Sequence, residues 1–230
     1  MGGTMEVYKV VIISDTHCIE IDEVPDCDIL IHCGDLTFEG SEEQIGSALR
    51  WLSKLPGQHK ILVAGNHDWL FERDAKTATE MCDELGITYL MDRLIEVCGI
   101  RIYGSPWQPE FFQWAFNLPR GEPLAEKWDK IPENTDILIT HGPPIKVLDF
   151  VPKSGFHVGC EELKKVVDKI KPAVHAFGHI HEGYGVEVID KTMFINASIC
   201  DEKYKPINKP IEIEIFKSFS GFKARRFEAD

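Results

Sequence analysis

The stretch Gly178-His179-Ile180-His181-Glu182-Gly183-Tyr184-Gly185 directly follows the apolar run Ala173-Val174-His175-Ala176-Phe177. A short apolar run that stops at a glycine is typical of a buried strand, so the two histidines are expected at a strand end. If the segment stays extended, His179 and His181 project to the same side. Two imidazoles that converge on one point form half of a metal site. A lone His-x-His pair more often has one packed and one solvated histidine, so the rest of the chain decides.

Four earlier apolar runs also end in polar residues, and each is predicted to be a buried strand. The runs lie at 8–14, 28–33, 60–64 and 136–140. The polar residues at their ends are Asp15-Thr16-His17, Gly34-Asp35, Gly65-Asn66-His67-Asp68 and His141. Each motif alone is common, whereas five in this order, each directly after an apolar strand, are not expected by chance. The five strand ends therefore predict one shared site.

The remaining pattern predicts helices and further short strands. Ser41 and Gln44 resemble a capping box at the start of the first helix. Helices are expected at 41–55, 72–85 and 160–170. Short strands are expected at 87–90, 95–98, 100–103, 186–189, 192–196 and 211–216, with Asp190-Lys191 as a hairpin turn. Because no linker or repeat interrupts the pattern, residues 1–230 are interpreted as one α/β domain with two β-sheets.

The segment from Gly104 to Gly121 has no clean period. It is rich in aromatic residues and bounded by prolines, so an ordered loop is expected. Such a loop either covers the site as a lid or merely covers the core, and the sequence leaves both possibilities open.

Charge and cysteine usage limit the partners and the compartment. A formal net charge of -13 argues against a nucleic-acid groove or an anionic membrane surface. A phosphate-bearing substrate then needs a strong local cation, such as a pair of divalent metal ions. The seven cysteines are scattered and form no Cys-x-x-Cys pair, which indicates free thiols in a reducing compartment. The first residues lack a signal-peptide pattern and no apolar run reaches membrane-spanning length, so a cytoplasmic location is expected.

The order of the five strand-end motifs resembles the calcineurin-like metallophosphoesterase superfamily, whose signature is Asp-x-His, Gly-Asp, Gly-Asn-His-Asp/Glu, His and Gly-His-x-His. The resemblance implies a four-layer αββα sandwich of two mixed β-sheets flanked by helices. It also implies two divalent metal ions. The implied ligands are Asp15, His17 and His181 for the first ion, Asn66, His141 and His179 for the second, and Asp35 bridging both.

Further segments narrow the resemblance to the metallophosphoesterase-domain-containing subfamily, which is linked to cyclic-nucleotide phosphodiester hydrolysis. The matching segments are 104–109, 116–121, 141–144 and 178–185. Some animal members have glycine at the first histidine of Gly-His-x-His, which weakens activity. This chain has His179 there, which favours a fully active enzyme.

These residue types suit phosphoester hydrolysis by in-line attack of a metal-bridging hydroxide. Two cations about 3.5–4 Å apart can clamp a phosphoryl group and stabilise the attacking and leaving oxygens. A bridging carboxylate such as Asp35 has two oxygens to share between the ions. Imidazole, carboxylate and amide ligands suit manganese, the first choice here, and also iron or zinc. Cys18 and Cys33 adjoin candidate ligands, but we expect both to point into the core.

His67 is the candidate catalytic residue. It follows the candidate ligand Asn66, so in an extended loop it points away from the metal and towards the leaving group. In the family, the matching histidine stabilises the transition state or protonates the leaving oxygen. Asp68 is expected to cap or orient the same loop.

Substrate contacts are less sharply defined. Four residues could meet a phosphate or stack on a base, namely Asn117, Arg120, Trp107 and Tyr184. The leading hypothesis is a phosphodiesterase that acts on cyclic nucleotides or related nucleotide phosphoesters. A broad-specificity phosphomonoesterase on the same site and a nucleotide-binding scaffold with low activity are the alternatives, and the sequence does not predict an oligomeric state.

Overall fold

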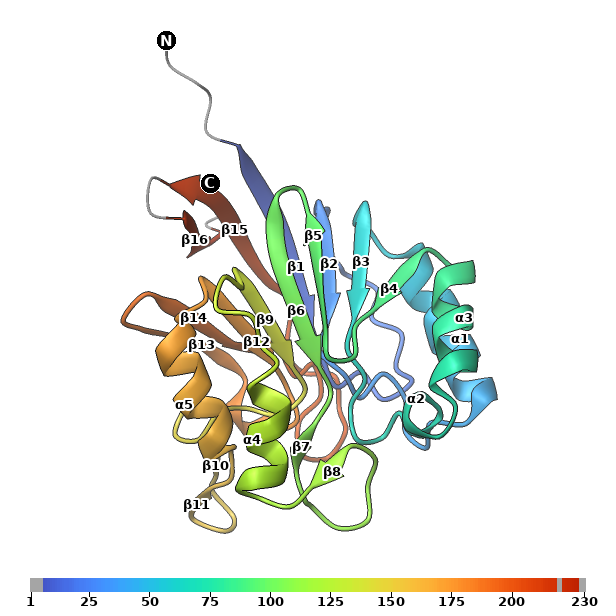
Figure 1. Cartoon of the computed structure of the whole chain (residues 1–230). Helices are drawn as coiled ribbons and strands as arrows, with labels where there is room; N and C mark the ends of the chain where they lie inside the picture. Colours follow the sequence, from blue (N-terminus) through green and yellow to red (C-terminus); the bar gives the residue numbers. More distant parts are fainter. Residues whose placement is uncertain (1–5, 219–220, 228–230) are drawn as a thin grey trace.

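A computed structural model describes residues 6–218 and 221–227 of the chain. The first five residues, on which the expectation about a signal peptide depends, lie outside the described residues. Two mixed β-sheets, each of six strands, pack face to face and carry helices on their outer faces (Figure 1). This is the predicted four-layer αββα arrangement.

The first sheet is built around the amino-terminal strand. Its strand order is β16, β15, β1, β2, β3 and β4, with bounds Gly221–Arg226, Ile211–Ser218, Val7–Ile13, Ile29–His32, His59–Leu62 and Ile87–Tyr89. Strands β1 to β4 run parallel, whereas β15 and β16 are antiparallel to their neighbours. The sequence interpretation omitted β16, although Phe222 and Ala224 alternate there with charged residues.

The second sheet contains the strand that precedes the two histidines. Its order is β13, β14, β12, β9, β6 and β5, with bounds Gly185–Ile189, Thr192–Asn196, Val174–Phe177, Ile137–Thr140, Ile100–Ser105 and Arg93–Val97. The predicted hairpin at 186–196 forms the antiparallel pair of β13 and β14. Strands β14, β12, β9 and β6 are parallel, so their carboxyl ends lie at one edge.

Alternation along the strands explains how both sheets are buried on two faces. In β1, Val10 and Ile12 belong to the core between the sheets, whereas Val11 and Ile13 face the helices of the first sheet. Near-continuous apolar runs of this kind are expected for parallel strands covered on both sides. The polar residues that follow these strands are therefore at the end of the sandwich, below the strands in Figure 1.

Helices cover the outer face of each sheet. The first sheet is covered by α1 (Glu42–Lys54), α2 (Trp69–Arg73) and α3 (Ala75–Glu84), and the second by α4 (Glu122–Trp128) and α5 (Glu161–Ile170). The Ser41 side chain accepts a hydrogen bond from the Gln44 N–H, as predicted, but the Gln44 side chain accepts from the Glu39 N–H instead of closing a capping box. The helix predicted at 72–85 corresponds to α3, but its predicted start is wrong, because Asp74 caps α3 and separates it from α2.

The segment 104–121 is mostly irregular, as predicted. It contains the short strands β7 (Gln108–Pro109) and β8 (Asn117–Leu118), which pair with each other. Within this segment, Ala115 and Phe116 are buried, whereas Phe111 and Phe112 are exposed. The short strands β10 (Phe150–Val151) and β11 (Phe156–His157) form an antiparallel hairpin at the same end of the molecule (Figure 1). The 3-10 turn η1 (His181–Gly183) lies against β10.

Candidate metal centre

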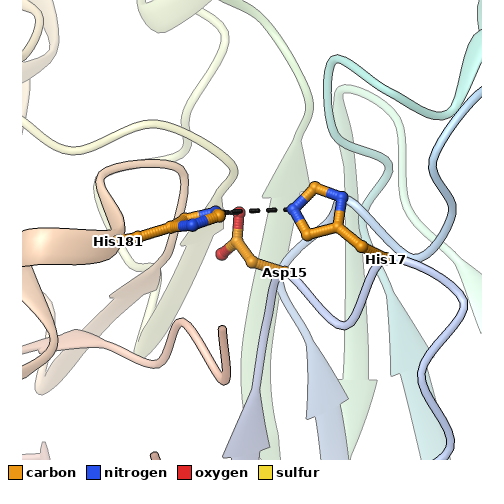
Figure 2. Close-up of side chains that lie close together, drawn as sticks. All are labelled: Asp15, His17 and His181. Atoms are coloured by element: carbon orange, nitrogen blue, oxygen red, sulfur yellow. Dashed lines mark hydrogen bonds and ion pairs between the residues drawn. The ribbon is translucent and has the colours of Figure 1, made fainter. Parts of the chain in front are cut away.

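One cluster of candidate ligands joins the two sheets. Asp15 and His17 follow β1 in the first sheet, and His181 begins η1 beyond β12 in the second. The His181 Nε2 lies 3.3 Å from Asp15 Oδ1 and 3.4 Å from the His17 Nε2. Figure 2 shows the two imidazoles approaching the Asp15 carboxylate from opposite sides. These are three of the residues that the resemblance assigns to the first ion.

A second cluster contains Asp35, His141 and His179, with Asn66 beside it. The Asp35 Oδ2 lies 3.3 Å from the His141 Nε2 and 3.9 Å from the His17 Nε2, so it faces both clusters. The other oxygen, Oδ1, accepts a hydrogen bond from the His67 N–H at 2.8 Å. Oδ2 is thus the oxygen of Asp35 that lies near the imidazoles of both clusters.

The backbone at the site is held in a conformation that non-glycine residues rarely adopt. Positive φ angles occur at Asp15 (54°), His17 (46°), Asp35 (51°) and His179 (67°). Such angles cost free energy and persist where the surrounding structure over-determines them, often at functional sites. The extended conformation expected for His179 and His181 is therefore wrong, because His179 is left-handed and His181 opens a 3-10 turn. The turn directs the two rings to different clusters.

Two glycines allow the loops to approach the carboxylates. A Cβ at Gly178 would collide with Asp15 Oδ2, and a Cβ at Gly65 would collide with the Asp35 backbone and side chain. Glycine at these positions lets the β12 and β3 loops lie directly against the candidate ligands.

Backbone carbonyls fix the orientation of four histidine rings. In each ring Nδ1 lies within hydrogen-bond distance of a carbonyl oxygen, which requires Nδ1 to donate and leaves Nε2 as the acceptor. The pairs are His17 with Thr37 at 3.2 Å, His67 with Phe38 at 2.7 Å, His141 with Cys33 at 2.9 Å and His181 with Asp201 at 2.8 Å. All four Nε2 atoms are thereby available as ligands or proton carriers.

Further hydrogen bonds hold the carboxylates of Asp15 and Asp68. Asp15 accepts hydrogen bonds from the Ser198 hydroxyl at 2.8 Å and from the His179 N–H. Asp68 accepts from the N–H groups of Leu36, Thr37 and Gly65 and from the Thr37 hydroxyl. Asp68 therefore joins the loop of Asp35 to that of Asn66. Of the two roles predicted for Asp68, the structure shows the orientation of the loop. Its side chain makes no capping hydrogen bond to α2.

The buried charges are strongly interdependent. Burial raises the pKa of Asp15, but the adjacent His181, together with His141 and His17, outweighs burial and holds the pKa well below its usual value. Conversely, burial lowers the pKa of His141, but the carboxylates of Asp35 and Asp15 and the Cys33 carbonyl together outweigh burial and raise the pKa to about 9. Burial lowers the pKa of His179 to about 3, so this ring is neutral and able to bind a cation. The site thus favours ionised carboxylates beside imidazoles.

The donor set fits a pair of divalent cations. Each cluster supplies three ligand atoms from carboxylate and imidazole groups, and Asp35 faces both. Thiolates are absent from these clusters, as expected. Cys33 is buried, as predicted, whereas the expectation that Cys18 points into the core is wrong because it is exposed. All seven cysteines lie in the described chain and are free.

A cavity of about 480 Å³ opens onto the clusters. Its polar floor is formed by His17, Asp35, Asn66, His67, His179 and His181. Arg120 also lines it, but its terminal nitrogens already donate to the carbonyls of Val158 and Gly159 and to Glu161.

The other three candidates for substrate contact do not line this cavity. The Trp107 indole N–H donates to Asp92, and the Tyr184 hydroxyl donates to the Lys209 carbonyl. The Asn117 side-chain amide donates to the carbonyls of Phe111 and Phe112. In this structure the three side chains make hydrogen bonds within the protein, and the expectation that they contact substrate stays a prediction.

Tyr204 lines the cavity and was absent from the sequence prediction. Its ring lies edge-on to His17, with 4.8 Å between ring centroids, and 5.7 Å from that of His181. The Asp201 carbonyl that orients His181 also accepts from the Tyr204 N–H, so one turn positions both residues. Residues 201–205 carry no periodic pattern, which explains why sequence reasoning missed Tyr204.

Comparison with known proteins supports the fold and the family. Metallophosphoesterase domain-containing protein 1 of Homo sapiens is 43% identical over 230 residues, covering 90% of this chain and 71% of that protein. A UPF0046 protein of Caenorhabditis elegans is 36% identical over 224 residues, covering 85% of this chain and 56% of that protein.

Solved structures show the same fold at low sequence identity. TT1561 of Thermus thermophilus aligns with a TM-score of 0.56 at 14% identity, covering 96% of this chain and 99% of that chain. The NAD nucleotidase of Haemophilus influenzae aligns with a TM-score of 0.51 at 12% identity, covering 98% of this chain and 50% of that chain. No described helix is both long and apolar enough to cross a membrane.

The model of the calcineurin-like phosphoesterase family matches residues 8–183, which include every candidate ligand. This family implies a metal-dependent phosphoesterase with a centre of two divalent ions, which agrees with the donor set described above. The chain therefore belongs to the calcineurin-like phosphoesterase family.

Proposed function

We propose that the protein hydrolyses phosphodiesters, with cyclic nucleotides or related nucleotide phosphoesters as substrates, and that manganese is its resident metal. The observation that carries the proposal is the convergence of two ligand clusters on Asp35 Oδ2, with the His67 Nε2 4.0 Å from the same oxygen. Free cysteines throughout the described chain fit action in the cytoplasm.

The candidate ligands divide between the two clusters. Asp15, His17 and His181 would hold one ion, Asn66, His141 and His179 the other, and Asp35 Oδ2 would contact both. When bound, two divalent ions would stabilise negative charge on the attacking and leaving oxygens of an in-line displacement. The hydrogen bonds from the histidine Nδ1 atoms to backbone carbonyls, and those that Asp15 and Asp35 accept, keep the ligand atoms oriented before substrate binds.

The contacts of His67 support a role in delivering a proton to the leaving alcohol. Its Nδ1 donates to the Phe38 carbonyl, and its ring stacks on Trp114 with 4.1 Å between ring centroids. The ring is thus held on two sides, while His67 also lines the cavity. In its protonated form, Nε2 can donate a proton to an alkoxide that leaves phosphorus.

The charge of the cavity favours a diester over a monoester. Among the described lining residues, Arg120 is the one lysine or arginine, and its terminal nitrogens are already engaged. A phosphate monoester carries nearly two negative charges at neutral pH, whereas a diester carries one. Beyond the metal centre, the described lining residues therefore offer no free cation for the second charge.

A substrate panel on metal-stripped protein reconstituted with manganese, iron or zinc tests the proposal. The panel contains a cyclic nucleotide, bis(p-nitrophenyl) phosphate and p-nitrophenyl phosphate. We expect the diesters to have the higher kcat/KM and manganese to support the highest kcat. A clear preference for the monoester would favour a phosphomonoesterase, and full metal occupancy without hydrolysis would favour a binding protein.

A further inference from the structure

The cavity extends past the second cluster, where its wall is apolar. The Phe111 ring lies edge-on to His179, with 6.1 Å between ring centroids. At Gly142, an added Cβ would lie 4.0 Å from the His179 Cδ2, so this wall stands directly beside a candidate ligand. The remaining apolar lining residues are Pro109, Pro143, Val151, Val158 and Ile180.

Hydrogen bonds between distant segments hold this apolar wall in place. Asn117 fixes the Phe111 loop by donating to the Phe111 and Phe112 carbonyls at 3.1 and 3.0 Å. Arg120 ties the end of the same loop to the Val158 and Gly159 carbonyls, both at 2.7 Å. The wall is therefore formed before any ligand binds, which limits the ordering cost of binding.

Carboxylates line the cavity outside the metal clusters. Glu110, Glu182 and Glu202 are lining residues, and Glu202 pairs with Lys203 at 3.7 Å. Glu110 and Glu182 have no ion-pair partner among the described residues. A second phosphate in this region would meet negative charge and no free cation from the described lining, which disfavours it.

We propose that the apolar wall is a subsite for an uncharged, planar or apolar organic group of the substrate. The protein accordingly selects phosphodiesters with one negative charge and discriminates against those that carry an additional phosphate. This inference rests on the proposed diester hydrolysis and adds the class of substrate that the same site accepts.

Three cyclic diesters that undergo the same ring opening test the subsite. They are glycerol 1,2-cyclic phosphate, adenosine 2′,3′-cyclic phosphate and adenosine 5′-phosphate 2′,3′-cyclic phosphate. We expect kcat/KM to be about tenfold higher for the second than for the first, because stacking on an aromatic side chain contributes about that factor. We expect kcat/KM for the third to be about fivefold lower than for the second, because its extra phosphate would enter a cavity lined by Glu110 and Glu182.

Two variants assign these differences to residues. Phe111→Ala should lower kcat/KM for adenosine 2′,3′-cyclic phosphate about tenfold, and by a clearly smaller factor for glycerol 1,2-cyclic phosphate, which has no base to stack on the ring. Phe111 is 51% exposed, so the chain should fold normally, and Phe156→Ala, at 69% exposed and outside the cavity, is the matched control. Glu110→Lys should improve the substrate with two phosphates, whereas Glu187→Lys on β13 should not.

Adenosine binding to the metal-free protein gives a second readout, by saturation-transfer NMR. We expect a signal that Phe111→Ala weakens and Phe156→Ala does not. Equal kcat/KM for all three cyclic diesters, or adenosine binding that Phe111→Ala does not weaken, would overturn the proposed subsite. Neither result would contradict diester hydrolysis itself. Hydrolysis of p-nitrophenyl phosphate alone would overturn the diesterase, and the NMR result would then decide the subsite independently.

Discussion

Replacing His67 with alanine should slow the reaction by an amount that depends on the leaving group. The ring is buried against Trp114, and its Nδ1 is bound to the Phe38 carbonyl, so Nε2 has one defined position beside Asp35. A positioned general acid contributes about 10²–10⁴ in rate. We therefore expect kcat on a cyclic nucleotide, which expels an alkoxide, to fall about 10³-fold, or about 4 kcal/mol.

The matching loss on bis(p-nitrophenyl) phosphate should be about tenfold or less, because p-nitrophenolate leaves without needing a proton. The assay compares kcat of the wild type and His67→Ala on both substrates, with bound metal counted in each sample. His59→Ala is the control, since His59 begins β3 at the end of the strand opposite the site.

Equal losses on the two substrates would refute proton delivery by His67. Loss of a metal ion from the His67→Ala variant would also contradict this role, for another reason. His17, Asp35 and His67 also lie close enough together to hold a cation, so that result would make His67 a ligand.

Three further predictions concern the centre and its support. His179→Gly should weaken binding of the second ion and lower kcat at least 10²-fold, and unchanged metal titration and rate would remove His179 from the centre. Asp68→Asn should lower the free energy of unfolding by about 2–4 kcal/mol in urea denaturation, because it disrupts buried hydrogen bonds to three residues; a change within error would contradict this. Burial lowers the pKa of His32 and His175 to about 3, so the unfolded chain alone takes up these protons as the pH falls below 6.5. These two rings should each lower the free energy of unfolding by about 2 kcal/mol between pH 7 and pH 5, and His175→Gln should remove the share of His175; an unchanged pH dependence in this variant would argue against the buried neutral ring.

The sequence predicted the parts of the fold that follow from local periodicity. The buried strands β1, β2, β3, β9 and β12 lie within two residues of their predicted bounds, because each is a short apolar run closed by a polar motif. The five motifs, each directly after an apolar run, are the reason why residues as distant as Asp15 and His181 were expected to share a site. The two residues follow strands of different sheets, whose ends meet at one end of the sandwich.

Features that depend on tertiary contacts were predicted poorly. Helical spacing continues through Asp74, but this side chain accepts from the Thr77 N–H and starts a new helix. His179 adopts a left-handed backbone, a conformation that no periodic pattern indicates. The walls of the cavity come from loops around Phe111, Val158 and Tyr204, whose juxtaposition follows from the fold and from no local signal.

The same limitation explains the candidates for substrate contact. Trp107, Asn117 and Tyr184 have side chains that suit nucleotide binding, yet none of them lines the cavity and each makes hydrogen bonds within the protein. Residue type indicated the chemistry available, whereas position decided which groups a substrate can reach.

The most direct test of the central claim is an anomalous difference map from crystals of the manganese-reconstituted protein. We predict two peaks about 3.5–4 Å apart, one beside Asp15, His17 and His181 and the other beside Asn66, His141 and His179, with Asp35 between them. A single peak, or peaks away from these side chains, would contradict a two-metal centre at the joined ends of the two sheets.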